Sequence, residues 1–236
     1  MQKVIHRAET RGHFNHGWLN TYHSFSFAEY YNPDRIQFGM LRVLNDDIVK
    51  PGMGFGTHPH NNMEIITIPL EGQLEHRDSM GNGSVIEAGE VQVMTAGSGI
   101  THSEFNPSSD EEVNLLQIWV FPRERNLTPR YDQKRFDTSK MKNQLMMVVT
   151  PDGDNGSLFI HQDAWFSLAE VEEGKELNYQ LHNDKHGIYL FVIDGELEVG
   201  EDALKSRDGI GIYDVSEISV KSKRSTKFIV MEIPMN

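Results

Sequence analysis

The chain has 236 residues, of which 22 are basic and 35 acidic, giving a formal net charge of −13, and it contains no cysteine. This length suffices for one large domain or two small ones. The acidic excess argues against a nucleic-acid-binding surface and against adhesion to anionic membranes, because both need clustered basic residues. The absence of cysteine excludes disulfides, thiolate metal sites and a cysteine nucleophile.

Two features of the sequence bear on where the protein resides. Residues 1–14 contain no apolar segment of the length that a secretory signal requires. The longest unbroken apolar run, Ile188–Ile193, is far too short to span a bilayer. We therefore expect a cytoplasmic protein that does not enter a membrane.

The first part of the chain predicts two strands. His23, Phe25 and Phe27 alternate with serines, which is typical of a half-buried strand. Residues 38–44 (FGMLRVL) predict the next strand, and Asn45–Asp47 predict a turn, because Asn and Asp favour turns. The adjacent carboxylates of that turn could also form an acid–base pair, but turn formation explains them more simply.

Two histidine clusters form the main candidate site. His58 and His60 are two residues apart after a glycine-rich stretch, and Glu64 keeps their parity if the strand is unbroken. His102 and Glu104 form a second such pair. Side chains at i and i+2 of a strand point to one face. Three imidazoles with a carboxylate suit a divalent first-row metal and are typical of non-haem Fe(II) oxygenases. The spacing alone leaves open whether Glu64 or Glu104 supplies the carboxylate.

The remaining pattern is one of short strands separated by Gly, Asn and Asp turns, with little helical periodicity, which predicts an all-β fold. The expected elements are strands at residues 65–70, 91–94 and 114–122, a hairpin turn at 78–83, a polar linker at 123–135 and a short helix around 138–144.

The second half repeats the first weakly. Residues 71–75 resemble residues 194–198 at an offset of 123, and residues 88–94 resemble 208–214 at an offset of 120. Strand–turn–strand units that recur in this way imply two copies of one small β-domain. We expect an N-terminal metal-binding domain at 1–132 and a degenerate domain at 133–236. The offsets carry no ligand into the second copy, so we expect one metal per chain and a surface location for His186.

The sequence also resembles a known family. The pattern Gly52-x5-His58-x-His60-x3-Glu64 is similar to the first cupin motif, and Gly89 with Thr95-Ala96-Gly97-x4-His102 is similar to a modified second motif. Cupins are small jelly-roll barrels. More specifically, the chain resembles the pirin family of two-domain cupins. The segments that carry this resemblance are Arg11–His13, Asn15–Trp18, His23–Phe27, Phe38–Asp47, His58–His60 and Met94–Glu104.

The resemblance implies two tandem cupin barrels with few short helices. It implies one metal held by His58, His60, His102 and Glu104, most commonly Fe(II), with Mn, Ni, Cu and Zn also compatible. Glu64 would then lie in the pocket or behind a ligating imidazole. Either Glu104 or Glu64 could act as the catalytic base.

The activity that the resemblance implies is quercetin 2,3-dioxygenase, which cleaves a flavonol with O2 and releases carbon monoxide. The alternative is a metal-dependent, redox-sensing regulatory protein that binds a protein partner, without direct contact to nucleic acid. A third interpretation is a cupin isomerase or another oxygenase with a different enol substrate. Phe25, Phe27 and Phe55 are expected either on the pocket wall or in the core.

Overall fold

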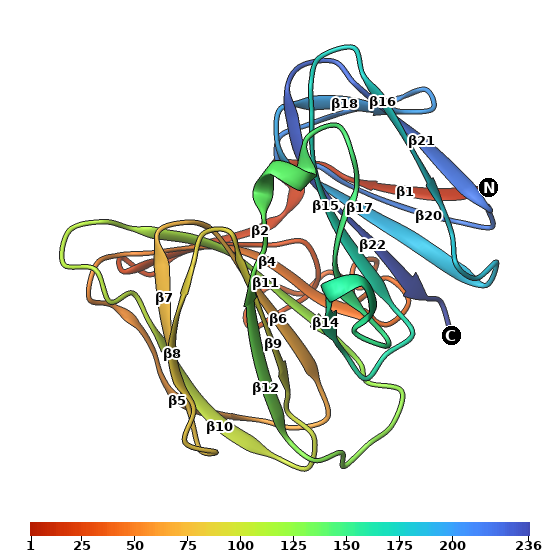
Figure 1. The fold of residues 1–236 in the computed structure, drawn as a ribbon. Helices are drawn as coiled ribbons and strands as arrows, with labels where there is room; N and C mark the ends of the chain where they lie inside the picture. The colour runs from red at the N-terminus through yellow and green to blue at the C-terminus, as the bar shows by residue number, and fades with distance from the viewer.

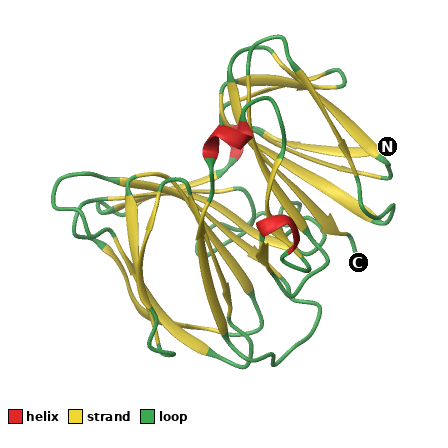
Figure 2. Ribbon diagram, in the orientation of Figure 1, coloured by secondary structure: helices red, strands yellow, loops and turns green.

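The computed structural model describes all residues, 1–236, and consists almost entirely of β-strands with three short 3-10 helices (Figure 2). The helices are η1 (Ala8–Thr10), η2 (Thr138–Met141) and η3 (Asp154–Gly156). The expected all-β fold is confirmed, and η2 accounts for the helix expected around residue 138. No helix is both long and apolar enough to cross a membrane.

The first half forms two facing sheets (Figure 1). The larger has the spatial order β12 (Arg130–Arg135), β9 (Glu90–Thr95), β6 (Glu64–Glu71), β11 (Val113–Val120), β4 (Leu41–Val49), β3 (Leu19–His23) and β2 (Gly12–Asn15). The smaller has the order β5 (Gly54–His60), β10 (Ile100–Phe105), β7 (Gln73–Asp78) and β8 (Gly83–Glu87). Two facing antiparallel sheets of this kind make a jelly-roll barrel.

The second half repeats the arrangement. Its larger sheet has the order β1 (Gln2–His6), β20 (Gly209–Tyr213), β17 (His186–Asp194), β22 (Thr226–Pro234), β15 (Trp165–Val171), β13 (Met146–Thr150) and β14 (Leu158–Phe159). Its smaller sheet has the order β16 (Glu176–Gln180), β21 (Glu217–Ser222), β18 (Glu196–Val199) and β19 (Asp202–Lys205). The two sheet pairs match in the number of strands and, apart from the parallel edge pair β13 and β14, in strand direction, as two tandem cupin barrels require.

Strand membership departs from a simple division of the chain. β1 pairs antiparallel with β20 and so completes the sheet of the second half. β12 pairs with β9 of the first half and extends to Arg135, so the segment expected as a polar linker is partly a strand. The boundary predicted after residue 132 falls inside β12. We propose instead that the connection between the two barrels begins after Arg135.

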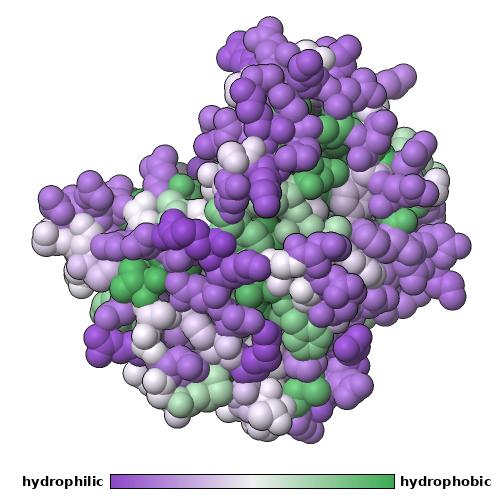
Figure 3. Space-filling view, in the orientation of Figure 1, coloured by the Kyte–Doolittle hydropathy of each residue, from purple (hydrophilic) through white to green (hydrophobic).

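The two larger sheets pack against each other through a shared hydrophobic core. Ile66 and Ile118 from the first half lie in one buried cluster with Phe166, Tyr189 and Phe191 from the second. Because side chains alternate along a strand, β6, β11 and β4 direct every other residue to this interface and the rest into the first barrel. In the space-filling view, hydrophobic residues gather where the two lobes meet, on an otherwise mostly hydrophilic face (Figure 3).

Two strand assignments from the sequence need correction. Asn45, Asp46 and Asp47 are not a turn, because they lie within β4 and are buried. The strand expected over His23–Phe27 ends at His23, and Ser24 and Ser26 are buried although the alternation placed them at the surface.

Candidate metal centre

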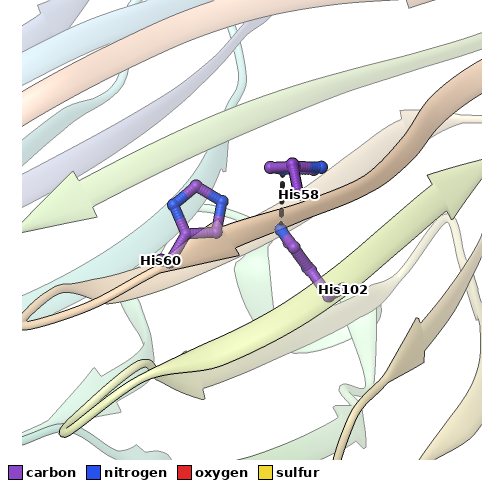
Figure 4. A group of neighbouring side chains, drawn as sticks. All are labelled: His58, His60 and His102. Carbon is purple, nitrogen blue, oxygen red and sulfur yellow. Dashed lines mark hydrogen bonds between the residues drawn. The ribbon is translucent and has the colours of Figure 1, made fainter.

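Three histidines converge from two paired strands of the smaller sheet (Figure 4). In the antiparallel register His102 of β10 lies directly opposite His58 of β5, and His60 projects to the same side. The Nε2 atoms of His58 and His102 are 3.0 Å apart. The three ring centroids lie 4.5–4.8 Å from one another. Gly54 permits this approach, because a Cβ there would lie 2.2 Å from the carbonyl oxygen of Glu104.

The carboxylate of Glu104, on the same strand as His102, lines the same cavity as the three histidines and lies close to His102. Gln117 Nε2 donates to both of its carboxylate oxygens, at 3.1 and 3.2 Å, and Gln117 Oε1 in turn accepts from Thr67 Oγ1 at 3.2 Å. Burial raises the pKa of Glu104 to about 7, although the bond from Gln117 opposes the rise. A cation beside Glu104 would favour its ionised form.

These residues fit a divalent transition metal. Burial, and then the neighbouring His58, lowers the pKa of His60 to about 4, so its imidazole is neutral at pH 7. Burial and the other histidines lower the pKa of His102 to about 2. His58 Nδ1 lies 2.8 Å from the carbonyl oxygen of Gly56, to which it donates, so its Nε2 lone pair is free. Neutral imidazoles are metal ligands. With metal–nitrogen bonds of about 2.1 Å, two ligands at a right angle lie roughly 3 Å apart.

Glu64 does not join this group. The chain leaves the strand at residues 61–63, where Asn62 has a φ of 48°, and so the parity with His60 is lost. Glu64 lies on the interface face of β6, fully buried, where its Oε2 accepts from Thr95 Oγ1 at 2.9 Å and from the backbone nitrogen of His161 at 3.2 Å. Glu64 therefore does not line the cavity, and its hydrogen bonds go to Thr95 and His161 rather than to a ligating imidazole, so neither expected placement is found.

His58, His60, His102 and Glu104 all line a cavity of about 270 Å³ inside the first barrel. Phe27 and Phe55 are on its wall, whereas Phe25 lies in the core between the barrels. The complete lining is His16, Leu19, Thr21, His23, Phe27, Ala28, Asn45, Asp47, Phe55, His58, His60, Ile65, His102, Glu104, Gln117 and Trp119. A larger cleft of about 630 Å³ lies between the two halves, but no histidine lines it.

The cavity wall also carries a second polar group, formed by Thr21, His23 and Asp47, that the sequence patterns did not indicate. Thr21 Oγ1 donates to Asp47 Oδ1 at 2.5 Å and lies 2.8 Å from His23 Nε2. Burial raises the pKa of Asp47 to about 7 and lowers that of His23 to about 4. These residues are brought together from β3 and β4, so only the folded arrangement shows them as part of one wall.

A fourth histidine also approaches the centre and was missed as a site residue. His76 of β7 is fully buried, and its Nδ1 lies 3.4 Å from His102 Nδ1. His76, His102 and Glu104 place one potential ligand atom each within 4.8 Å of one another, as do His58, His60 and His102. The sequence signal was present, since His76 precedes Asp78 by two residues on a strand, but nothing local linked it to His102.

In the second half, His182 and His186 contact the carboxylate of Glu232. Glu232 is fully buried and accepts from Tyr179 Oη at 2.8 Å and from the backbone nitrogens of His182 and Asn183. The Nδ1 atoms of His182 and His186 lie 2.7 and 2.9 Å from its two oxygens. His186 is thus buried, and its expected surface location is wrong. Both groups of three close ligand atoms lie in the first half of the chain.

Known protein families and relatives match both halves of the chain. The family model described as Pirin matches residues 4–120, and that described as Quercetinase C-terminal cupin domain matches residues 147–233. A protein of Escherichia coli (strain K12) named quercetin 2,3-dioxygenase is 42% identical over 230 residues, covering 98% of each chain.

Solved structures give the same result. The crystal structure of YhhW from Escherichia coli has a TM-score of 0.95 and 41% identity, covering 99% of this chain and 98% of that one. A structure described as bacterial pirin YhhW in complex with nickel(II) has a TM-score of 0.94 and 40% identity, covering 99% of both chains.

Proposed function

This chain belongs to the pirin family, and from that premise we propose that it is a metal-dependent dioxygenase that cleaves flavonols such as quercetin with O2 and releases carbon monoxide. The observation that supports the proposal is the convergence of His58, His60 and His102 in a cavity with aromatic walls, which Glu104, a close neighbour of His102, also lines. The relative named quercetin 2,3-dioxygenase supports the substrate class.

We propose that His58, His60 and His102 supply three nitrogen ligands and Glu104 the carboxylate. Bound there, a divalent cation would act as a Lewis acid and lower the pKa of a coordinating enol hydroxyl. Fe(II) is the proposed metal, because three imidazoles with a carboxylate and open positions suit it, while Mn, Ni, Cu and Zn accept the same donor atoms.

The surrounding residues would orient the substrate and move its proton. A carboxylate oxygen of Glu104 accepts the enol proton, and Gln117, which donates to both oxygens, holds that carboxylate in place. Phe27, Phe55 and Trp119 offer apolar faces to the flavonol rings and exclude water. A cavity of 270 Å³ lies just below the usual range of about 300–1,000 Å³. A three-ring flavonol would therefore extend through the mouth.

The test uses the purified protein loaded separately with Fe(II), Mn(II), Ni(II), Cu(II) and Zn(II), with metal content measured by mass spectrometry. Quercetin is added under air while oxygen uptake and the loss of flavonol absorbance are recorded. His58→Ala is expected to remove bound metal and turnover while the far-ultraviolet circular dichroism is unchanged. His13→Ala, which changes an exposed histidine of β2, is the matched control and should retain both.

The outcome separates the proposed activity from its main alternative. Oxygen uptake that depends on metal and on His58 supports the dioxygenase. Stoichiometric metal with no oxygen uptake for any of the five metals would refute it, and would favour a metal-dependent binding role without turnover.

A further inference from the structure

We propose that His76 is a positioning residue for the metal ligand His102, accepting a hydrogen bond from its Nδ1 so that its Nε2 faces the metal, and that Asp78 holds His76 in the tautomer this requires. The inference rests on the metal centre of the proposed function, but not on the identity of the substrate. It assigns a role to the one buried histidine near the centre that does not line the cavity.

The sheet places His76 behind His102. β10 lies between β5 and β7, so His102 has the ligand histidines on one side and β7 on the other. In the register of β10 with β7, His102 pairs with Asp78 and Glu104 pairs with His76. Paired residues of an antiparallel ladder project to the same face. All four side chains therefore point into the barrel, with His76 diagonal to His102.

With a metal bound to His102 Nε2, the contacts determine the proton positions. A metal ligand needs a bare nitrogen, and His102 Nε2 is the atom that faces His58, at 3.0 Å. The proton of the neutral His102 ring is then on Nδ1, which lies 3.4 Å from His76 Nδ1. One proton lies between those two nitrogens, so His76 Nδ1 is the acceptor. The proton of His76 is therefore on Nε2.

Asp78 explains why His76 adopts that tautomer. His76 Nε2 has no ordinary hydrogen-bond partner, and the nearest anionic atom is Asp78 Oδ2 at 3.5 Å, with both side chains fully buried. The negative charge favours a proton on the facing nitrogen. Asp78 is itself fixed, because its oxygens accept from the backbone nitrogens of Met80 and Asn82 and from Asn82 Nδ2. Ligating histidines commonly donate a hydrogen bond from their second ring nitrogen to a partner that orients the ring.

The same atoms could instead make His76 a ligand, together with His102 and Glu104. Two observations disfavour that set. It would use His102 Nδ1, which points away from His58 and His60, and so it would leave those two residues unused. Moreover, His76 does not line the cavity, so a metal held there would lie away from the space that a substrate can enter.

The experiment measures Co(II) binding to the whole protein by calorimetry and by the visible ligand-field spectrum. His76→Phe keeps a ring but removes the acceptor, and should weaken Co(II) binding about 10–100-fold and shift the absorption bands. His76→Gln retains an acceptor oxygen and should recover most of the affinity. Tyr131→Phe is the control, because its ring packs on His76 at 4.8 Å without touching His102 nitrogens, and should bind Co(II) as the wild type does.

Wild-type affinity and an unchanged spectrum in His76→Phe would overturn the proposal. Loss of all binding in both His76 variants would overturn it in favour of direct ligation, as would retained metal with one fewer imidazole per metal by X-ray absorption. Should His76→Phe fail to fold, the tautomers of the wild type decide. In the Zn(II)-loaded protein labelled with ¹⁵N-histidine, we expect Nδ1–H for His102 and Nε2–H for His76, and the reverse pattern would refute the assignment. Neither readout involves a flavonol. A failure of the His76 proposal can therefore be told apart from a failure of the dioxygenase proposal.

Discussion

Replacing Glu64 by glutamine should stabilise the protein at alkaline pH and leave its metal site intact. Burial, opposed by the hydrogen bonds from His161 and Thr95, raises the pKa of Glu64 from 4.5 to about 7 in the folded protein. Its second carboxylate oxygen is buried without a partner. Glutamine has the shape of the protonated side chain but cannot ionise, so it isolates the cost of the buried charge.

The magnitude follows from that pKa difference. Between pH 4.5 and about 7 the unfolded chain has lost the Glu64 proton that the folded chain retains, so stability falls as the pH rises through this window. Each pH unit is worth about 1.36 kcal/mol, which gives up to about 3 kcal/mol above pH 7. Glu64→Gln should therefore match the wild type at pH 4.5 and exceed its free energy of unfolding by that amount at pH 8.

The assay is urea unfolding of the metal-free protein at pH 4.5, 6 and 8, followed by tryptophan fluorescence and circular dichroism. Glu71→Gln, at the exposed end of the same strand, is the matched control and should show no pH-dependent gain. A Glu64→Gln effect that is independent of pH would refute the reasoning. Loss of metal binding in that variant would show instead that Glu64 serves the metal site.

Three other substitutions test contacts elsewhere in the fold. Asp46→Asn removes the carboxylate that lies 3.1 Å from the buried Arg11 guanidinium, and should cost about 3–5 kcal/mol in denaturant unfolding. Glu232→Gln replaces an acceptor that receives five donors, so its melting temperature should fall by several degrees while Co(II) binding to the first barrel is unchanged. Gly195→Ala, at a φ of 98° and with its new Cβ 2.4 Å from the carbonyl oxygen of Ser225, should yield little folded protein as judged by size-exclusion chromatography.

The sequence could reveal which site residues share one face of a strand. His58 with His60, and His102 with Glu104, are neighbours at i and i+2, and that relation is local. Their meeting also requires the register of β5 with β10. The error in placing Glu64 also has a local cause. The i, i+2 rule assumes an unbroken strand, and Asn62 interrupts the strand with a positive φ.

Other errors arose because distant partners outweighed local preference. Asp46 and Asp47 are typical turn residues, yet β4 buries both of them, since Arg11 and Asn114 bind one and Thr21 binds the other. His186 was expected at the surface because its partner, Glu232, is 46 positions away in the sequence. Local sequence patterns could not show either kind of contact, because the partners lie far apart in the chain.

The pairing of the first strand with β20 has a consequence for how the molecule is made and handled. Arg7 and Ala8, just after that strand, also bind the carboxylate of Asp208, which anchors the start of the chain near its end. On the ribosome, residues 2–6 must remain unpaired until the chain has been made as far as β20, about 200 residues later. Removing residues 2–6 would leave β20 as an unpaired edge strand of the second barrel. Unpaired sheet edges of this kind promote association between molecules.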